Sequence, residues 1–216
     1  MPRVVAFDVN ETLLDLGALD PLFERAFGDA AVRGQWFSQM LQLAFVGGLT
    51  GRYVDFTTAQ RAALAMLAER HQAQPDVDAI VGAMRSLPVH PEVPAALDAL
   101  PGPLAALTNS PLDVARDQLR NAGIADRFDA ILSADQVRAL KPRPEPYQLV
   151  ASTFGVSIGD VVLVAAHAWD VAGALSAGAR AAFVARPGMV LSPLGPRPEI
   201  VGRDLTEVAA ALEGGP

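Results

Sequence analysis

The sequence predicts an α/β fold, a doubly wound parallel sheet with a helical insertion, on the basis of three observations. Short apolar runs recur along the chain, and each is continuous rather than alternating, as expected for strands buried on both faces. Amphipathic segments separate most of these runs. Residues from about 15 to 87 show helical spacing and no strand-like run. The expected strands are Val4–Phe7, Leu104–Leu107, Ala130–Leu132, Val161–Val164 and Ala181–Val184.

Helices are expected between the later strands, and glycines stand where these helices should end. The expected helices are Leu112–Asn121, Pro146–Phe154 and Val171–Ala177, followed by Gly123, Gly155 and Gly178. We therefore predict a Rossmann-like core of residues 1–14 and 88–216, interrupted after the first strand by a helical cap of residues 15–87. Pro187–Pro198 carries four prolines and two glycines and should be an extended surface loop.

The composition limits the classes of function. Of the 216 residues, 51% are hydrophobic and 19% are charged, which is typical of a protein with a large core rather than a disordered chain. The net charge of −7 disfavours nucleic acids and anionic membranes as partners, and an anionic substrate would need a local positive site. The chain has no cysteine, which excludes disulfides and thiolate chemistry. No apolar run reaches membrane-spanning length and no secretory signal is apparent, so we expect a cytoplasmic protein.

Polar clusters follow four of the predicted strands, where ligands bind in open α/β sheets. Each cluster alone has an ordinary interpretation: a turn-forming Asp, a helix cap, a solvated Lys or a structural His. Their joint occurrence, in this order, predicts an active site. The clusters are Asp8-Val-Asn10-Glu-Thr12, Thr108-Asn109-Ser110, Lys141-Pro142 and His167-Ala-Trp169-Asp170.

These clusters resemble the motifs of the haloacid dehalogenase superfamily. The run from Phe7 to Leu14 looks like its first motif, Thr108-Asn109 its second and Lys141-Pro142 its third. The resemblance covers nearly the whole chain and includes the cap position. Within the superfamily the chain is most similar to the type II L-2-haloacid dehalogenases. The local marks are Gly51-Arg52-Tyr53, Lys141 with Tyr147 six residues on, and Ala168-Trp169-Asp170 followed by Gly173-Ala174. The resemblance also implies a homodimer formed through the cap.

The chemistry that these residues favour is covalent catalysis by a carboxylate. Asp8 is the candidate nucleophile, and water would hydrolyse the ester that it forms. Lys141 would hold Asp8 ionised and offset charge during the attack. Thr12 and Thr108 can donate hydroxyl groups to carboxylate oxygens, and Asn109 can donate its amide to the leaving group or substrate.

The second step needs a base for the water, and the substrate needs a binding surface. Asp170, with His167 near it, is the candidate for positioning or deprotonating the water. Asn10, Tyr147 and Trp169 are candidate substrate-binding residues, because they lie within the same motifs.

Two positions distinguish dehalogenation from phosphoryl transfer. Superfamily phosphatases typically carry a proton-donating Asp where this chain has Asn10, and a Gly-Asp pair where it has Ala165-Ala166. A hard divalent cation prefers several anionic oxygens, and a halide leaves without protonation. We therefore predict a hydrolase of small 2-haloalkanoic acids that needs no metal or cofactor. The alternatives are a phosphatase with a reduced metal site and a catalytically silent binding protein on the same fold.

One departure from the dehalogenase pattern puts the substrate in question. The L-2-haloacid enzymes carry a cap arginine that helps to receive the halide, and counting back from Gly51-Arg52-Tyr53 places Phe37 there. Arg33 and Arg52 are possible substitutes. The family also has Ser-Ser-Asn where this chain has Ala165-Ala166-His167.

Overall fold

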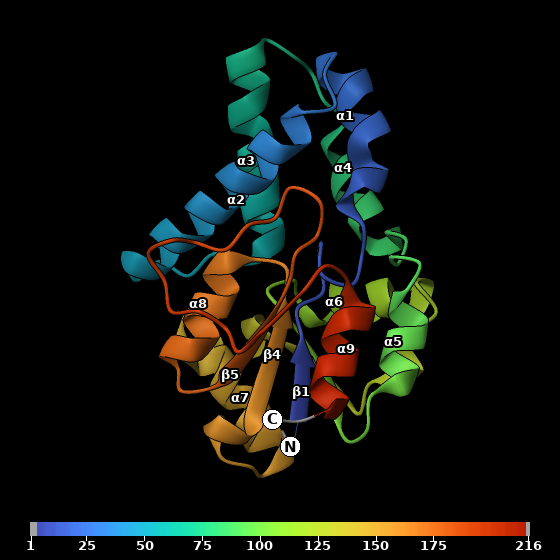
Figure 1. Ribbon diagram of the computed structural model, residues 1–216. Helices are drawn as coiled ribbons and strands as arrows, with labels where there is room; N and C mark the ends of the chain where they lie inside the picture. The colour runs from blue at the N-terminus through green and yellow to red at the C-terminus, as the bar shows by residue number, and fades with distance from the viewer. Residues whose placement is uncertain (1–3, 215–216) are drawn as a thin grey trace.

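The computed structural model describes residues 4–214 and contains a six-stranded parallel sheet (Figure 1). The strand order is β3-β2-β1-β4-β5-β6, which confirms the predicted fold class. Within residues 4–214, the one strand that was not predicted is β6, which at three residues is too short to give an apolar run. The strands are β1 (Val4–Phe7), β2 (Leu104–Thr108), β3 (Ala130–Ser133), β4 (Val161–Ala165), β5 (Arg180–Val184) and β6 (Ile200–Gly202).

Helices cover both faces of the sheet, which is why its central strands are mostly apolar. Successive residues of a strand point to opposite faces. Val5 and Phe7 of β1 pack into one core cluster, and Val4 and Ala6 pack into another. The first cluster includes α5 (Val93–Ala99), α6 (Leu112–Asn121) and α9 (Leu205–Gly214). The second includes α7 (Pro144–Phe154) and α8 (Ala168–Ser176), which begin slightly ahead of the predicted helices.

The predicted insertion consists of helices that lie beyond the carboxyl ends of the strands (Figure 1). They are α1 (Asp20–Phe27), α2 (Val32–Leu49), α3 (Phe56–His71) and α4 (Val77–Ala83). Their core is aromatic and aliphatic: Phe23, Trp36 and Leu64 are fully buried. The Trp36 indole donates a hydrogen bond to the Gln60 carbonyl at 3.0 Å, which ties α2 to α3. We propose that residues 15–87 form a cap over the active end of the sheet. Residues 1–3 and 215–216 of the proposed core lie outside the described residues.

The segment Pro187–Pro198 follows β5 and contains turns but no helix or strand. Val190 and Leu194 within it are exposed. No helix among residues 4–214 is both long enough and apolar enough to cross a membrane.

Candidate active site

The central carboxylate of the site belongs to Asp8, which follows β1 at the carboxyl edge of the sheet. Its backbone N–H continues the sheet by donating to the Val164 carbonyl of β4 at 3.0 Å. The Thr12 hydroxyl donates to Asp8 Oδ2 at 2.8 Å and accepts from the Ala166 N–H at 2.9 Å. Because the hydroxyl is fixed between these two groups, it fixes the orientation of the carboxylate.

Lys141 is fully buried, and its ammonium group lies between two carboxylates. Nζ donates to Asp8 Oδ1 at 2.9 Å, to Asp170 Oδ2 at 2.5 Å and to the Leu107 carbonyl at 3.0 Å, which uses all three of its hydrogens. Burial alone would lower the pKa of Lys141, but Asp170 and Asp8 outweigh it and raise the pKa. Burial would likewise raise the pKa of Asp8, but Lys141 and His167 hold it well below its usual range. Asp8 is therefore a carboxylate at neutral pH.

His167 makes a second cationic contact with Asp8. Nδ1 lies 3.0 Å from Asp8 Oδ2, and Nε2 lies 2.9 Å from Glu11 Oε2. Burial lowers the pKa of His167, but the hydrogen bonds with the two carboxylates outweigh it and raise the pKa to about 9. At neutral pH the ring is an imidazolium that donates from both nitrogens.

Asp170 and His167 do not act on each other directly in this geometry. Asp170 accepts from Lys141 and, through Oδ1, from the Tyr147 hydroxyl at 2.6 Å. The partner of His167 on its far side is instead Glu11, a residue that sequence reasoning did not select. Its place within the first motif was the one signal that could have identified it.

Cap residues contact the site through Glu11 and through aromatic rings. Arg33 Nη1 lies 3.5 Å from Glu11 Oε1, so this cap arginine reaches the site through a carboxylate. The Phe37 ring stacks on the His167 ring, with centroids 5.5 Å apart and an interplanar angle of 15°. Trp169 stacks on His167 as well, at 5.2 Å. Arg52 is exposed. The structure thus brings Phe37 and Arg33 to the site and leaves Arg52 at the surface.

Two of the predicted site residues, Asn109 and Thr108, bind backbone groups of the protein. Asn109 Nδ2 donates to the Lys141 carbonyl at 3.2 Å, and Asn109 Oδ1 accepts from the Lys141 N–H at 2.8 Å. The Thr108 hydroxyl accepts from the Ser110 N–H at 3.1 Å. The paired bonds of Asn109 hold the backbone that carries Lys141, so this amide positions the ammonium group.

Two buried polar atoms have no hydrogen-bond partner within residues 4–214: Gln118 Oε1 and Trp169 Nε1. The Gln118 amide donates to Asn10 Oδ1 at 2.9 Å, which engages the predicted substrate-binding Asn10. The indole N–H of Trp169 belongs to a ring that stacks on His167, so this donor without a partner lies in the ring next to His167.

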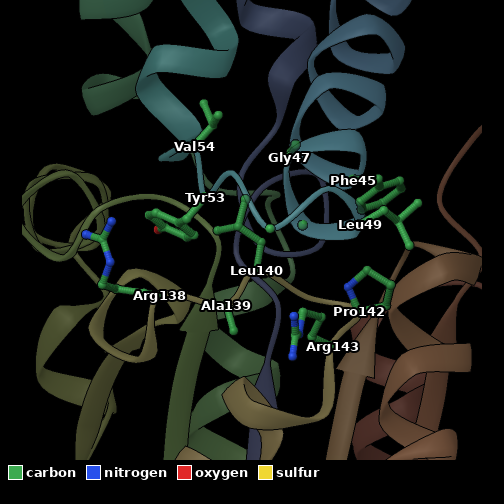
Figure 2. A pocket seen from close by; sticks show the side chains of 13 residues that line it. Phe45, Gly47, Leu49, Tyr53, Val54, Arg138, Ala139, Leu140, Pro142 and Arg143 are labelled. Atoms are coloured by element: carbon green, nitrogen blue, oxygen red, sulfur yellow. The ribbon is translucent and has the colours of Figure 1, made fainter.

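A cavity of about 550 Å³ adjoins the site between the end of α2 and the loop that carries Lys141 (Figure 2). Leu140 and Pro142, the neighbours of Lys141 in sequence, contribute to its wall together with Phe45 and Tyr53. The Arg138 guanidinium lies 4.7 Å from the centre of the Tyr53 ring. The wall is mainly apolar but also includes Arg138 and Arg143, and the side chains of Asp8, Lys141, His167 and Asp170 do not line it.

Comparison with known proteins identifies the family. The family model described as haloacid dehalogenase-like hydrolase matches residues 2–178. The chain belongs to this family of hydrolases. The resemblance to the haloacid dehalogenase superfamily seen in the sequence is therefore confirmed.

The alignments cover most of this chain and most of each similar protein. The (S)-2-haloacid dehalogenase of Xanthobacter autotrophicus is 33% identical over 192 residues, covering 86% of this chain and 76% of the relative. Haloacetate dehalogenase H-2 of Moraxella sp. (strain B) is 29% identical over 205 residues, covering 91% and 92%. The solved L-2-haloacid dehalogenase of Xanthobacter autotrophicus with chloropropionic acid covalently bound has a TM-score of 0.93 at 29% identity, covering 99% of both chains.

Proposed function

We propose that this hydrolase removes the halogen from short 2-haloalkanoic acids through a covalent ester on Asp8. The observation that carries the proposal is the ionised, hydrogen-bonded Asp8 carboxylate at the end of β1. The curated relatives support the substrate class, since they are 2-haloacid and haloacetate dehalogenases. A covalently bound chloropropionic acid in the similar structure supports the ester.

In the first step an Asp8 oxygen attacks the carbon that carries the halogen. The new C–O bond forms as the carbon–halogen bond breaks, and the halide leaves with the electron pair. Thr12 orients the attacking carboxylate, and Lys141 keeps it ionised. The halide needs no proton, so a neutral Asn10 is compatible with this step. The free indole N–H of Trp169 and the ring of Phe37 are the groups that we assign to the substrate.

In the second step water adds to the Asp8 carboxyl carbon and releases a 2-hydroxy acid. A tetrahedral oxyanion develops on the former carboxylate, and the Lys141 ammonium lies where it offsets that charge. Asp170 and Tyr147 hold the ammonium in this place.

No metal is needed for either step in this proposal. The Lys141 ammonium occupies the space between Asp8 and Asp170, the two carboxylates that a bridging cation would require. A phosphatase would also need a proton donor at Asn10, whose amide is already bound by Gln118. We further propose a homodimer, which the exposed Val46 and Leu49 at the end of α2 support.

The experiment that tests the proposal combines product release with isotope labelling. Chloride, bromide and phosphate release are measured from a panel of 2-haloacids and phosphoesters. Asp8→Asn should abolish halide release and leave the circular dichroism spectrum unchanged. Single-turnover hydrolysis in ¹⁸O-water should place the label in the Asp8 carboxylate before it appears in the product. Label that enters the hydroxy acid directly, with Asp8 unlabelled, would mean that water displaces the halide without an ester.

A further inference from the structure

We infer that Glu11 and His167 act as one unit in ester hydrolysis: His167 takes the proton from the attacking water, and Glu11 is the positioning residue that orients it. The inference rests on the proposed function, because it assigns the base for the second step of that reaction. In this assignment the base is His167 rather than Asp170.

The first support is the position of the imidazole relative to the nucleophile. His167 Nδ1 lies 3.0 Å from Asp8 Oδ2, so a water that adds to the Asp8 carboxyl carbon comes within reach of Nδ1. Asp170 is placed differently, because Lys141 occupies its Oδ2 and Tyr147 occupies its Oδ1. Both oxygens of Asp170 thus already accept hydrogen bonds, Oδ2 from the ammonium group and Oδ1 from the Tyr147 hydroxyl.

The second support is the way in which the chain fixes Glu11. Its backbone has a φ of 61°, a left-handed conformation that is uncommon outside glycine and is kept where the surroundings enforce it. The Glu11 N–H donates to the Leu14 carbonyl at 2.8 Å, and the Glu11 carbonyl lies 3.3 Å from His90 Nε2. Arg33, whose Nε donates to Asp20, also lies 3.5 Å from Glu11 Oε1 in an ion pair, and Oε2 lies 2.9 Å from His167 Nε2. This arrangement fixes which imidazole nitrogen faces Glu11 and which faces the ester.

The charged groups around His167 explain how an imidazolium can become a base. Asp8 and Glu11 face it directly, and the rings of Phe37 and Trp169 cover it. The groups one contact further away are Arg33, Lys141 and His90. In the free enzyme the two carboxylates raise the pKa of His167 to about 9. Ester formation removes the charge of Asp8, so the pKa of His167 falls and Nδ1 can release its proton.

The proton balance follows from this change. In the first step Asp8 forms its C–O bond, the halide leaves with the electron pair, and Nδ1 of His167 releases one proton to solvent. In the second step the water oxygen bonds to the Asp8 carboxyl carbon and its proton moves to Nδ1. The ester C–O bond to the carboxyl carbon then breaks, and the 2-hydroxy acid leaves with a proton from His167. The carboxylic acid left on Asp8 returns its proton to Nδ1, which restores the free enzyme.

Glu11→Gln tests the positioning role. The amide can still accept from Nε2 but lacks the charge that stabilises the imidazolium, so ester hydrolysis should slow by about 100-fold, within the usual range for acid–base assistance. Ester formation should change little. Rapid-quench measurements with 2-bromopropionate should therefore show a bromide burst equal to the enzyme concentration, with the ester accumulating on Asp8. The pH limb of the second step should move to lower pH, because removing a negative charge lowers the pKa of His167. Glu207→Gln, which alters a surface carboxylate of α9, is the matched control.

A second measurement needs no variant. Stopped-flow with a pH indicator on the wild-type protein should show proton release in the same phase as bromide release. Release of the proton only with the hydroxy acid would overturn the assignment. So would equal slowing of both steps in Glu11→Gln, or accumulation of ester in Asp170→Asn but not in Glu11→Gln. If the wild-type protein releases no halide from any haloacid, the proposed function itself fails, and this outcome is distinct from the others.

Discussion

Raising the pH is expected to weaken the folded protein through one buried group, His167. The ordinary pKa of histidine is 6.5, and in the folded protein the pKa of His167 is about 9, because Asp8 and Glu11 outweigh its burial. A raised pKa means that the folded state holds this proton more tightly than the unfolded chain does. The stabilisation is therefore fully present below pH 6.5 and is lost as the pH rises through 9. One pKa unit corresponds to about 1.4 kcal/mol, so the loss is roughly 3 kcal/mol.

Urea unfolding at a series of pH values from 6 to 9.5 measures this loss. The free energy of unfolding should fall across the series, and His167→Gln should flatten the curve in this window. Two partly buried groups have little effect in this window. Burial and Arg186 lower the pKa of His90, so its effect lies below pH 6.5. Burial and Asp135 raise the pKa of Tyr53 beyond the range of the experiment. An equal pH slope in the wild-type and His167→Gln proteins would refute the charge assignment of the site.

Two further predictions concern the reaction. Activity on 2-haloacids should survive treatment with a chelator, because Lys141 lies between Asp8 and Asp170; strict dependence on added magnesium would instead favour the phosphatase alternative. The wild-type protein should prefer bromo acids to chloro acids, and Phe37→Arg should narrow that preference, because a guanidinium stabilises the departing halide. A guanidinium as far from His167 as the Phe37 ring centre is, 5.5 Å, would at an effective dielectric constant of about 20 repel it by about 3 kcal/mol. That repulsion would lower the pKa of His167 by about two units. An unchanged bromide-to-chloride ratio, measured as kcat/KM, would show that Phe37 does not face the leaving group.

The core of the fold could be predicted from sequence because its strands are buried on both faces. A strand of this kind, such as Val161–Ala165, has to be apolar at every position, and that gives a continuous signal. The edge strand Ile200–Gly202 is short and partly exposed, so it lacks this signal. The helix Leu205–Gly214 comes soon after this strand. It was not predicted, because no recognisable strand precedes it in the sequence.

The site could be predicted only in part, for a related reason. Asp8, Lys141 and Asp170 follow strands or lie close to strand ends, and parallel strands bring their carboxyl ends to one edge. The contact between Glu11 and His167 depends instead on a left-handed backbone conformation at Glu11, which cannot be predicted from a Glu in the sequence. The approach of Arg33 and Phe37 depends on how the cap packs against the core, and no local pattern encodes that distance.

Positive and negative groups alternate along the site. The ion pairs that stabilise the folded site are therefore also the ones that change when the ester forms. Arg33, Glu11, His167, Asp8, Lys141 and Asp170 form a continuous chain of contacts in which each cation touches anions. Burying charges is costly unless each has a partner, so the chain is stable only when it is complete. Ester formation removes Asp8 from the middle of it and leaves the two cations on either side, His167 and Lys141, with one anion fewer. Lys141 keeps Asp170 as its partner at 2.5 Å, whereas His167 keeps only Glu11. Of these two cations, Lys141 has the higher ordinary pKa, so His167 is the one that should give up its proton, and the nitrogen that it frees is the one that faces the ester.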